Sequence, residues 1–229
     1  MAIVKKYQAE VVHIEEPVSQ LFTVTFKPLG GRFRYAPGQF LHLTLETYDP
    51  SESWPESRCF SMQSAPHNEN ILITYAVKGA YTRRMAQELL PGRIVTLKLP
   101  YGELFTQYHL KENAVFIAGG TGITPYLSLF SDPSFADYKN AVLYAGFKDK
   151  SFNFYENDLF KAREINPSCR VVYYYENENG IINISEIHKI NGNVKTYFIS
   201  GPPAMIKIFK SYLAQNGVPQ ENIKTDDWE

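Results

Sequence analysis

The sequence predicts a chain of two halves, a β-rich half followed by an α/β half. Up to about residue 100, short segments rich in β-branched and aromatic residues are separated by turns that contain Gly, Pro, Asn or Ser. This pattern is typical of a closed or nearly closed antiparallel barrel. After about residue 110, continuous apolar segments alternate with helical ones, as in a parallel sheet covered on both faces. We therefore expect two domains, 1–108 and 109–229, that meet in the polar stretch Tyr108–Asn113.

The N-terminal half is expected to contain several strands and one helix. Thr82 is the expected N-cap of the helix, which continues through Arg83–Leu90 with Met85, Leu89 and Leu90 on its apolar face. The expected strands are Tyr7–Ile14, Leu21–Lys27, Gln39–Leu45, Ile71–Val77 and Ile94–Leu99.

The C-terminal half is expected to alternate strands and helices. Its first helix opens at Thr124-Pro125, because proline at the first helical position loses no hydrogen bond. The expected strands are Ala114–Ala118, Asn140–Tyr144, Arg170–Tyr175 and Thr196–Ile199, and the further helices are Phe154–Glu164, Ile184–Ile190 and Pro203–Asn216.

Composition and charge exclude several classes of protein. With 229 residues, 44% of them hydrophobic and 21% charged, the chain is expected to fold rather than to be disordered or a coiled coil. Lys and Arg number 23 against 24 for Asp and Glu, and this net charge of -1 gives no general attraction to nucleic acid. We therefore expect no nucleic-acid partner.

Metal binding and membrane insertion are not expected either. Two cysteines cannot supply the four thiolates of an ordinary iron–sulfur cluster, and the five histidines are not spaced for a zinc site. The N-terminus lacks the apolar core of a signal peptide, and no stretch reaches the roughly 18 apolar residues of a membrane helix. These observations predict a cytoplasmic protein with no metal centre and no membrane span.

The first candidate site is the glycine-rich segment Gly119–Thr124, which lies between an apolar strand and a helix. The amides and the positive dipole end of that helix would face the carboxyl edge of the sheet, where they suit a pyrophosphate. The spacing is not the usual G-x-G-x-x-G. The α/β context favours a nucleotide site over a simple turn.

The second candidate site is Ser200–Met205, directly after the expected strand Thr196–Ile199. This Ser-Gly-Pro-Pro turn places a hydroxyl at the same carboxyl edge of the sheet, where ligands bind in open α/β folds. By itself the segment is equally consistent with an ordinary turn between a strand and a helix.

The third candidate site is Arg58–Ser64, in the barrel half. It combines a guanidinium that can pair with phosphate, an aromatic ring and a hydroxyl. In an extended segment Arg58 and Phe60 share one face, and Cys59 and Ser61 share the other. An ordinary edge strand has the same composition.

Together these segments resemble the ferredoxin–NADP(+) reductase superfamily. Arg58–Ser61 resembles its R-x-[YF]-S flavin motif, and Lys78–Thr82 its K-G-x-x-S/T loop. Gly92–Phe105 is similar to G-D-x-V-x-[IL]-x-x-P-x-G-x-F, Ala118–Pro125 to A-G-G-T-G-I-[AT]-P and Ser200–Met205 to [C/S]-G-P-P-x-M. Motifs in register along nearly the whole chain are far more specific than any one of them. The resemblance implies a six-stranded antiparallel flavin-binding barrel and a five-stranded parallel nucleotide-binding sheet.

The resemblance also implies a role for each motif. Arg58 would pair with the flavin phosphate, Phe60 would stack on the isoalloxazine, and Ser61 would hydrogen-bond N5, which receives the hydride. Ser200 would lie near the nicotinamide C4, so Ser61 and Ser200 are the expected catalytic residues. The start of the barrel helix would hold the FAD pyrophosphate. The other expected cofactor-binding residues are Cys59, Tyr75, Val77, Lys78, Gly79, Ala80, Tyr81, Thr82, Gly119, Gly120, Thr121, Gly122, Thr124, Glu176, Gly201, Pro202 and Trp228.

The chain departs from the family pattern at three positions, one of which is Thr82, where the more common residue is serine and the hydroxyl is kept. Ser200 replaces the usual cysteine, which excludes a thiol from hydride transfer there, and Arg93 replaces the usual aspartate. The tail Thr225–Trp228 resembles the T-E-x-[FW] ending of the family, so that Trp228 would lie against the flavin.

The expected function is a flavin-dependent NAD(P)H oxidoreductase that passes hydride from nicotinamide to FAD and electrons to a separate acceptor, such as ferredoxin, flavodoxin or an oxygenase component. One alternative is a reductase that uses free flavin as a substrate, and another is an electron-transfer subunit of a larger complex. Glu176 lies where relatives that use NADPH have Ser-Arg, so NADH is the expected donor. Lys148 and Lys150 argue against this preference.

Overall fold

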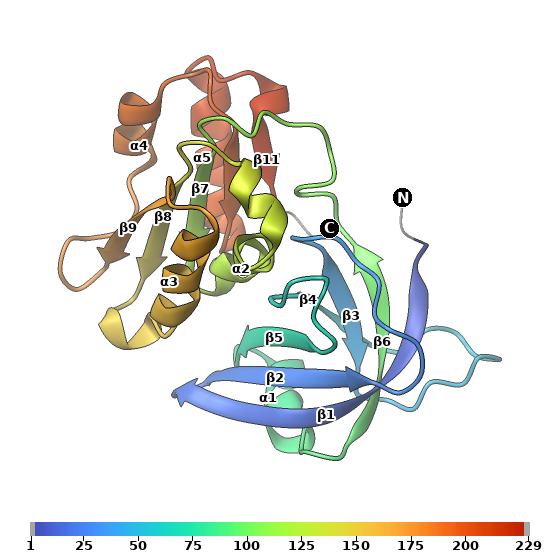
Figure 1. Ribbon diagram of the computed structural model, residues 1–229. Coiled ribbons are helices and arrows are strands. Elements are labelled where there is room, and N and C mark those ends of the chain that lie inside the picture. Colours follow the sequence, from blue (N-terminus) through green and yellow to red (C-terminus); the bar gives the residue numbers. More distant parts are fainter. Residues whose placement is uncertain (1–2, 227–229) are drawn as a thin grey trace.

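A six-stranded antiparallel sheet and a five-stranded parallel sheet form the two halves of the computed structural model, which describes residues 3–226 (Figure 1). The antiparallel half contains the N-terminus, and the parallel half lies beside it with helices on both faces (Figure 1). The fold class predicted from the sequence is therefore confirmed.

The antiparallel sheet curls into a nearly closed barrel with the strand order β4-β3-β6-β1-β2-β5. Just after the edge strand β4, the amide of Gln63 donates a hydrogen bond to the carbonyl of Leu72 in the other edge strand, β5 (2.8 Å). Side chains alternate between the interior and the outside, so that Ile71, Ile73 and Tyr75 of β5 are buried in the barrel core. The strands are β1 (Lys5–Val18), β2 (Leu21–Pro28), β3 (Phe40–Thr44), β4 (Arg58–Ser61), β5 (Ile71–Ala76) and β6 (Ile94–Tyr101).

The barrel helix α1 (Ala80–Glu88) begins before the position predicted from the sequence. Gly79 is its N-cap, whereas Thr82 lies inside the first turn, so the predicted cap was wrong. The Thr82 hydroxyl oxygen accepts hydrogen bonds from the amides of Lys78 (2.9 Å) and Gly79 (3.1 Å). A hydroxyl at this third position reaches back to the amides before the helix, as in a capping box.

The parallel sheet has the strand order β11-β10-β7-β8-β9. Phe116 of β7 faces a core that α2 and α3 cover, whereas Ile117 faces a second core under α4 and α5. The strands are β7 (Val115–Gly119), β8 (Val142–Phe147), β9 (Arg170–Tyr175), β10 (Tyr197–Ser200) and β11 (Ile223–Thr225). The α-helices are α2 (Thr124–Phe130), α3 (Glu156–Ile165), α4 (Ile184–Asn191) and α5 (Pro203–Gln215), and the short 3-10 segments are Gly120–Ile123, Pro133–Asp137, Lys150–Phe152 and Gln220–Asn222.

Strand β8 begins and ends later than predicted. Asn140 has a φ of 52°, so the chain turns there instead of starting the strand. The strand continues to Phe147, and Gly146 pairs with Gly119 of β7 at the carboxyl edge of the sheet. Strand β8 therefore ends, at Phe147, beside the glycine-rich segment.

The two halves are joined by hydrogen bonds and by ring contacts. The Ser128 hydroxyl of α2 donates to the carbonyl of Ser64, which follows β4 (2.9 Å). Within the barrel half, the Tyr35 hydroxyl donates to the same carbonyl of Ser64, at 3.0 Å. Phe105, from the segment after β6, packs on Phe198 of β10 with ring centroids 5.0 Å apart.

Among residues 3–226 no helix is both long enough and apolar enough to cross a membrane. The same residues contain no cluster of His, Cys, Asp and Glu side chains that could hold a metal ion.

Candidate functional site

A cleft of about 1100 Å³ takes its walls from both halves of the molecule. Strands β4 and β5 form one wall, and the carboxyl edge of the parallel sheet forms the other. The three candidate segments of the sequence therefore meet in one place. The predicted site residues that line this cleft are Cys59, Phe60, Ser61, Tyr75, Lys78, Gly119, Gly120, Thr121, Gly122, Thr124, Glu176, Ser200, Gly201 and Pro202.

The glycine-rich segment packs directly against the Ser200 turn. A Cβ atom on Gly122 would lie 2.5 Å from the carbonyl carbon of Ser200 and 2.6 Å from Cα of Gly201. A Cβ atom on Gly119 would lie 2.9 Å from Cδ of Pro202. Only glycine allows this backbone-to-backbone approach, so the two segments form one continuous cradle at the sheet edge.

Ser200 is held by an acid that sequence reasoning did not assign to the site. Its side chain is buried, and its hydroxyl donates to Oδ2 of Asp226 (3.1 Å), which follows β11 and also lines the cleft. The amide of Asp226 donates to the carbonyl of Ile199, which fixes the carboxylate beside Ser200. The resemblance of the tail to a family ending was the only signal in the sequence for this residue.

The faces of β4 are as predicted. Phe60 is buried, and its ring meets that of Tyr75 with centroids 6.0 Å apart. Cys59 points to the other face, where its Sγ lies 3.5 Å from Nε2 of His42. Burial raises the pKa of the Cys59 thiol, so the sulfur stays protonated near neutral pH. This cysteine is therefore not an activated nucleophile.

Arg58, the first residue of β4, lies outside the cleft and next to the start of α1. Its guanidinium lies 4.8 Å from the ring centroid of Tyr81, and it forms an ion pair of 2.8 Å with Glu56. The predicted site residues that do not line the cleft are Arg58, Val77, Gly79, Ala80, Tyr81 and Thr82. Except for Val77, we call them the helix-start surface. Trp228 lies outside the described residues.

The helix-start surface has fewer free amides than the sequence motif suggests. The Thr82 hydroxyl occupies the amides of Lys78 and Gly79. The first amides inside α1, those of Ala80 and Tyr81, lie at the positive end of the helix and have no partner within it. An anion at this place would therefore be bound by the first turn of the helix and not by the loop before it.

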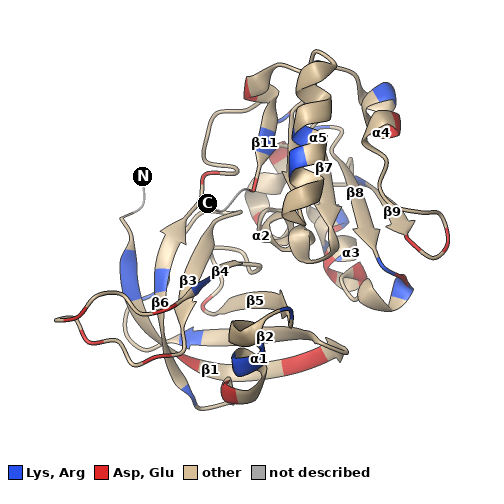
Figure 2. Cartoon of the chain, turned by 180° about the vertical axis from the view of Figure 1, so that it is seen from behind, with Lys and Arg blue, Asp and Glu red and all other residues tan. Residues whose placement is uncertain are grey.

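Charges of both signs line the parallel-sheet wall. Glu176 is exposed just after β9, and its amide donates to the carbonyl of Phe147. Lys148 also lines the cleft, whereas Lys150 pairs with Glu178 (3.0 Å). Sequence reasoning missed Lys207 and Lys210 of α5, which lie in the blue segments of that helix and line the same wall (Figure 2).

Two buried hydroxyls in the cleft lack hydrogen-bond partners. Tyr75 and Tyr155 are 2% and 1% exposed, and within residues 3–226 neither Oη has a partner. Leaving a buried polar group unpaired costs about 1–3 kcal/mol. Burial raises the pKa of both phenols, so each remains a hydrogen-bond donor. Both residues line the cleft, but their hydroxyl oxygens have almost no accessible surface in it.

The parallel-sheet half matches a known family model. The model for the oxidoreductase NAD-binding domain matches residues 116–211. This range contains the glycine-rich segment, Glu176 and the Ser200 turn.

Curated relatives cover both halves of the chain. The ferredoxin reductase component of 3-ketosteroid-9-alpha-monooxygenase from Rhodococcus rhodochrous is 24% identical over 205 residues, which are 86% of this chain and 57% of the relative. Methane monooxygenase component C from Methylosinus trichosporium is 27% identical over 192 residues, which are 78% of this chain and 53% of the relative. The chain thus spans a little more than half the length of these relatives.

Solved structures share the whole fold. A ferredoxin NADP+ reductase from Neisseria gonorrhoeae, with bound FAD and NADP, has a TM-score of 0.78 at 19% identity, covering 97% of this chain and 98% of that one. A ferredoxin reductase in carbazole 1,9a-dioxygenase has a TM-score of 0.76 at 18% identity, covering 99% and 70%. At these identities the likeness concerns the fold.

Proposed function

We propose that the chain belongs to the ferredoxin–NADP(+) reductase superfamily and is a flavin-dependent NAD(P)H oxidoreductase that passes electrons to a separate acceptor. The observation that carries the proposal is the shared cleft, in which the flavin motif of β4 faces the glycine cradle of the parallel sheet. We propose that 1–108 is the flavin-binding domain and 109–229 the nucleotide-binding domain, and that the protein is cytoplasmic.

The residues present fit a flavin and a nicotinamide nucleotide. Phe60 and Tyr75 line the cleft, and their rings would offer an aromatic surface to an isoalloxazine or a nicotinamide. The close approach of Gly122 to Ser200 leaves backbone, and no side chain, at the place where a pyrophosphate would bind. The guanidinium of Arg58 and the first amides of α1 supply the complementary charge for a flavin phosphate.

A bound flavin supplies the hydride and single-electron chemistry, so the residues of this chain have to position and hold the reactants. Phe60 provides a ring for stacking, and Ser61 provides a hydroxyl beside it. Ser200, fixed by Asp226, closes the opposite side of the cleft. No histidine lines the described part of the cleft, and hydride transfer requires no general base there.

Purified protein tests the proposal directly. A yellow protein with stoichiometric FAD, bleached by NADH or NADPH in the absence of oxygen, is the expected result. A colourless protein that reduces added flavin would instead establish the free-flavin reductase. A bound flavin that neither nucleotide reduces would contradict the proposed activity and favour a subunit of a larger complex.

The acceptor is proposed from the relatives. Both curated relatives are components of monooxygenases, and one of them is described as a ferredoxin reductase component. We propose an oxygenase component, a ferredoxin or a flavodoxin as the acceptor of this chain. Reduction of such a protein by the isolated chain, compared with reduction of free flavin, separates these acceptors from the free-flavin alternative.

Replacing Ser61 by alanine is expected to slow the chemical step more than binding. The hydroxyl is proposed to hydrogen-bond the flavin at N5, so its loss should lower the single-turnover rate of flavin reduction at nearly unchanged nicotinamide affinity. Stopped-flow measurement of the flavin absorbance gives both quantities. An unchanged rate would remove Ser61 from the catalytic residues.

NADH is the proposed electron donor, and Glu176 is the proposed reason. Its exposed carboxylate would accept from a ribose 2′-hydroxyl and repel a 2′-phosphate. Lys150 is engaged by Glu178, whereas Lys148 and Lys207 are cations of the parallel-sheet wall that would favour a phosphate. We expect a larger kcat/KM for NADH than for NADPH. Glu176→Ser should reduce the ratio between these two values. A larger kcat/KM for NADPH in the unchanged protein would refute the preference.

A further inference from the structure

Arg58 is already engaged by the chain's own groups. One guanidinium nitrogen donates to Oε1 of Glu56 (2.8 Å), and another donates to the carbonyl of Ser57 (2.8 Å). One face of the guanidinium covers the ring of Tyr81. The guanidinium nitrogens that would pair with a flavin phosphate are therefore partly occupied.

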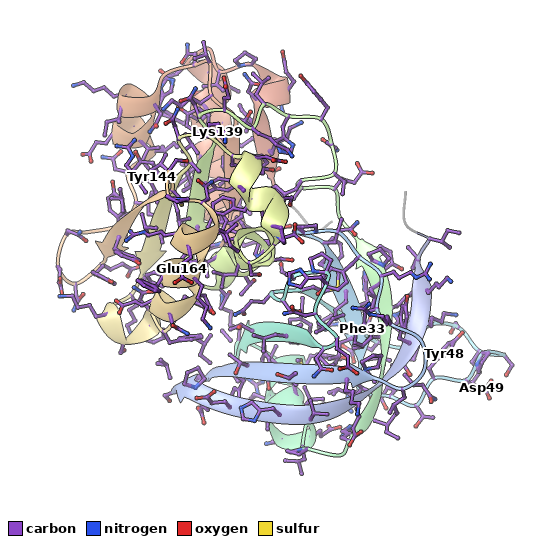
Figure 3. All side chains as sticks on the ribbon, viewed as in Figure 1. Phe33, Tyr48, Asp49, Lys139, Tyr144 and Glu164 are labelled. Carbon is purple, nitrogen blue, oxygen red and sulfur yellow. The ribbon has the colours of Figure 1, made fainter. Side chains whose placement is uncertain are left out.

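Glu56 ends the loop that connects β3 to β4, and this loop carries several acids. Figure 3 shows Tyr48 and Asp49 on the outer part of the loop, away from the parallel-sheet half. Nearer the barrel, Glu46 pairs with Arg84 of α1 (2.8 Å), as Glu56 pairs with Arg58. The loop is thus bound to α1 through Arg84 and to the start of β4 through Arg58.

We propose that Glu56 competes with the flavin phosphate for Arg58 and so weakens the binding of flavins that carry a phosphate. This inference rests on the proposed function, in which Arg58 binds that phosphate. A carboxylate 2.8 Å from the guanidinium cancels much of its charge. A phosphate that reaches Arg58 either displaces Glu56 or lies beside a second negative charge. Both possibilities lower the affinity for phosphate-bearing flavins.

The size of the effect follows from the exposure of the pair. The side chains of Arg58 and Glu56 are 50% and 55% exposed, so solvent and salt screen their attraction. Exposed ion pairs of this kind correspond to roughly a 1.4- to 5-fold change in an equilibrium constant. Removing Glu56 should therefore tighten flavin binding measurably, most of all at low ionic strength.

Glu56→Gln tests the competition through flavin affinity, without any turnover. The dissociation constants of FMN and riboflavin are measured by flavin fluorescence on flavin-free protein at low ionic strength. FMN should bind about two- to fivefold more tightly to the variant, while riboflavin, which lacks the phosphate, should bind equally to both proteins. Unchanged or weaker FMN binding would overturn the proposal, as would equal tightening of riboflavin.

Glu52→Gln is the matched control, because this exposed acid lies on the same loop and makes no ion pair with Arg58. Equal tightening of FMN by this variant would indicate a general charge effect and overturn the competition. A double-mutant cycle with Arg58→Ala completes the test, since Glu56→Gln should have no effect once Arg58 is absent. If Arg58→Ala itself leaves FMN affinity unchanged, the proposed role of Arg58 fails. If only Glu56→Gln has no effect, the competition alone fails.

Discussion

Arg58→Ala is expected to weaken flavin binding by about 1.5–3 kcal/mol, the range for hydrogen bonds to charged groups. This corresponds to a loss of roughly 10- to 150-fold in affinity. The structure gives a physical reason, because Arg58 lies on the ring of Tyr81 at the start of α1, where its charge adds to that of the helix amides. Titration of flavin-free protein with FMN or FAD measures the loss.

Arg93→Ala is the control for this variant. Arg93 pairs with Glu88 at the other end of α1 (3.0 Å) and donates to the carbonyl of Leu45 (2.7 Å). Its removal should lower the free energy of unfolding while the flavin affinity remains that of the parent protein. Equal flavin affinity in Arg58→Ala and the parent would contradict the assignment of Arg58.

Gly122→Ala is expected to disrupt the glycine cradle and to destabilise the fold. The added Cβ would lie 2.5 Å from the carbonyl carbon of Ser200 and 2.6 Å from Cα of Gly201. Backbone atoms surround it, so no side chain can move aside. Overpacking of this kind typically costs about 1–3 kcal/mol, and we expect the upper end here. Nucleotide affinity should fall as well, because the cradle and the Ser200 turn have to separate.

Denaturant unfolding and nucleotide titration measure the two effects of this variant. Gly31→Ala is the matched control, since a Cβ at Gly31 meets no atom within 4 Å. This variant should stay within about 0.5 kcal/mol of the parent in the free energy of unfolding. A similarly small change in the free energy of unfolding for Gly122→Ala would show that the backbone of the cradle can shift to accommodate the added methyl group.

The sequence predicts both halves of the fold because each half repeats one hydrophobic pattern many times. The prediction of secondary structure from the sequence fails at short elements. Strand β4 has four residues and β11 has three, too few for a pattern to be distinguished from a loop. The sequence does not distinguish a hydroxyl at the N-cap from one at the third residue of a helix, because both can bond amides near the helix start. Thr82 is therefore predicted as the cap although it lies inside the first turn.

The candidate site was predictable where a motif carried it and not where packing creates it. The glycine segment and the Ser200 turn carry their own sequence signals. Tyr155 and Lys207 carry none, since they reach the cleft only because the two halves pack as they do. Asp226 was recognised in a tail motif, but only the structure shows its bond to Ser200. Sequence patterns report local periodicity, whereas a cleft between halves depends on contacts distant along the chain.

The bond between Ser128 and Ser64 links the two walls of the cleft directly. Ser64 follows Ser61 on the loop after β4, and Ser128 belongs to α2, which opens at Thr124 next to the glycine cradle. The separation of the two cleft walls therefore depends on this contact between α2 and the loop after β4, and not on the polar linker alone.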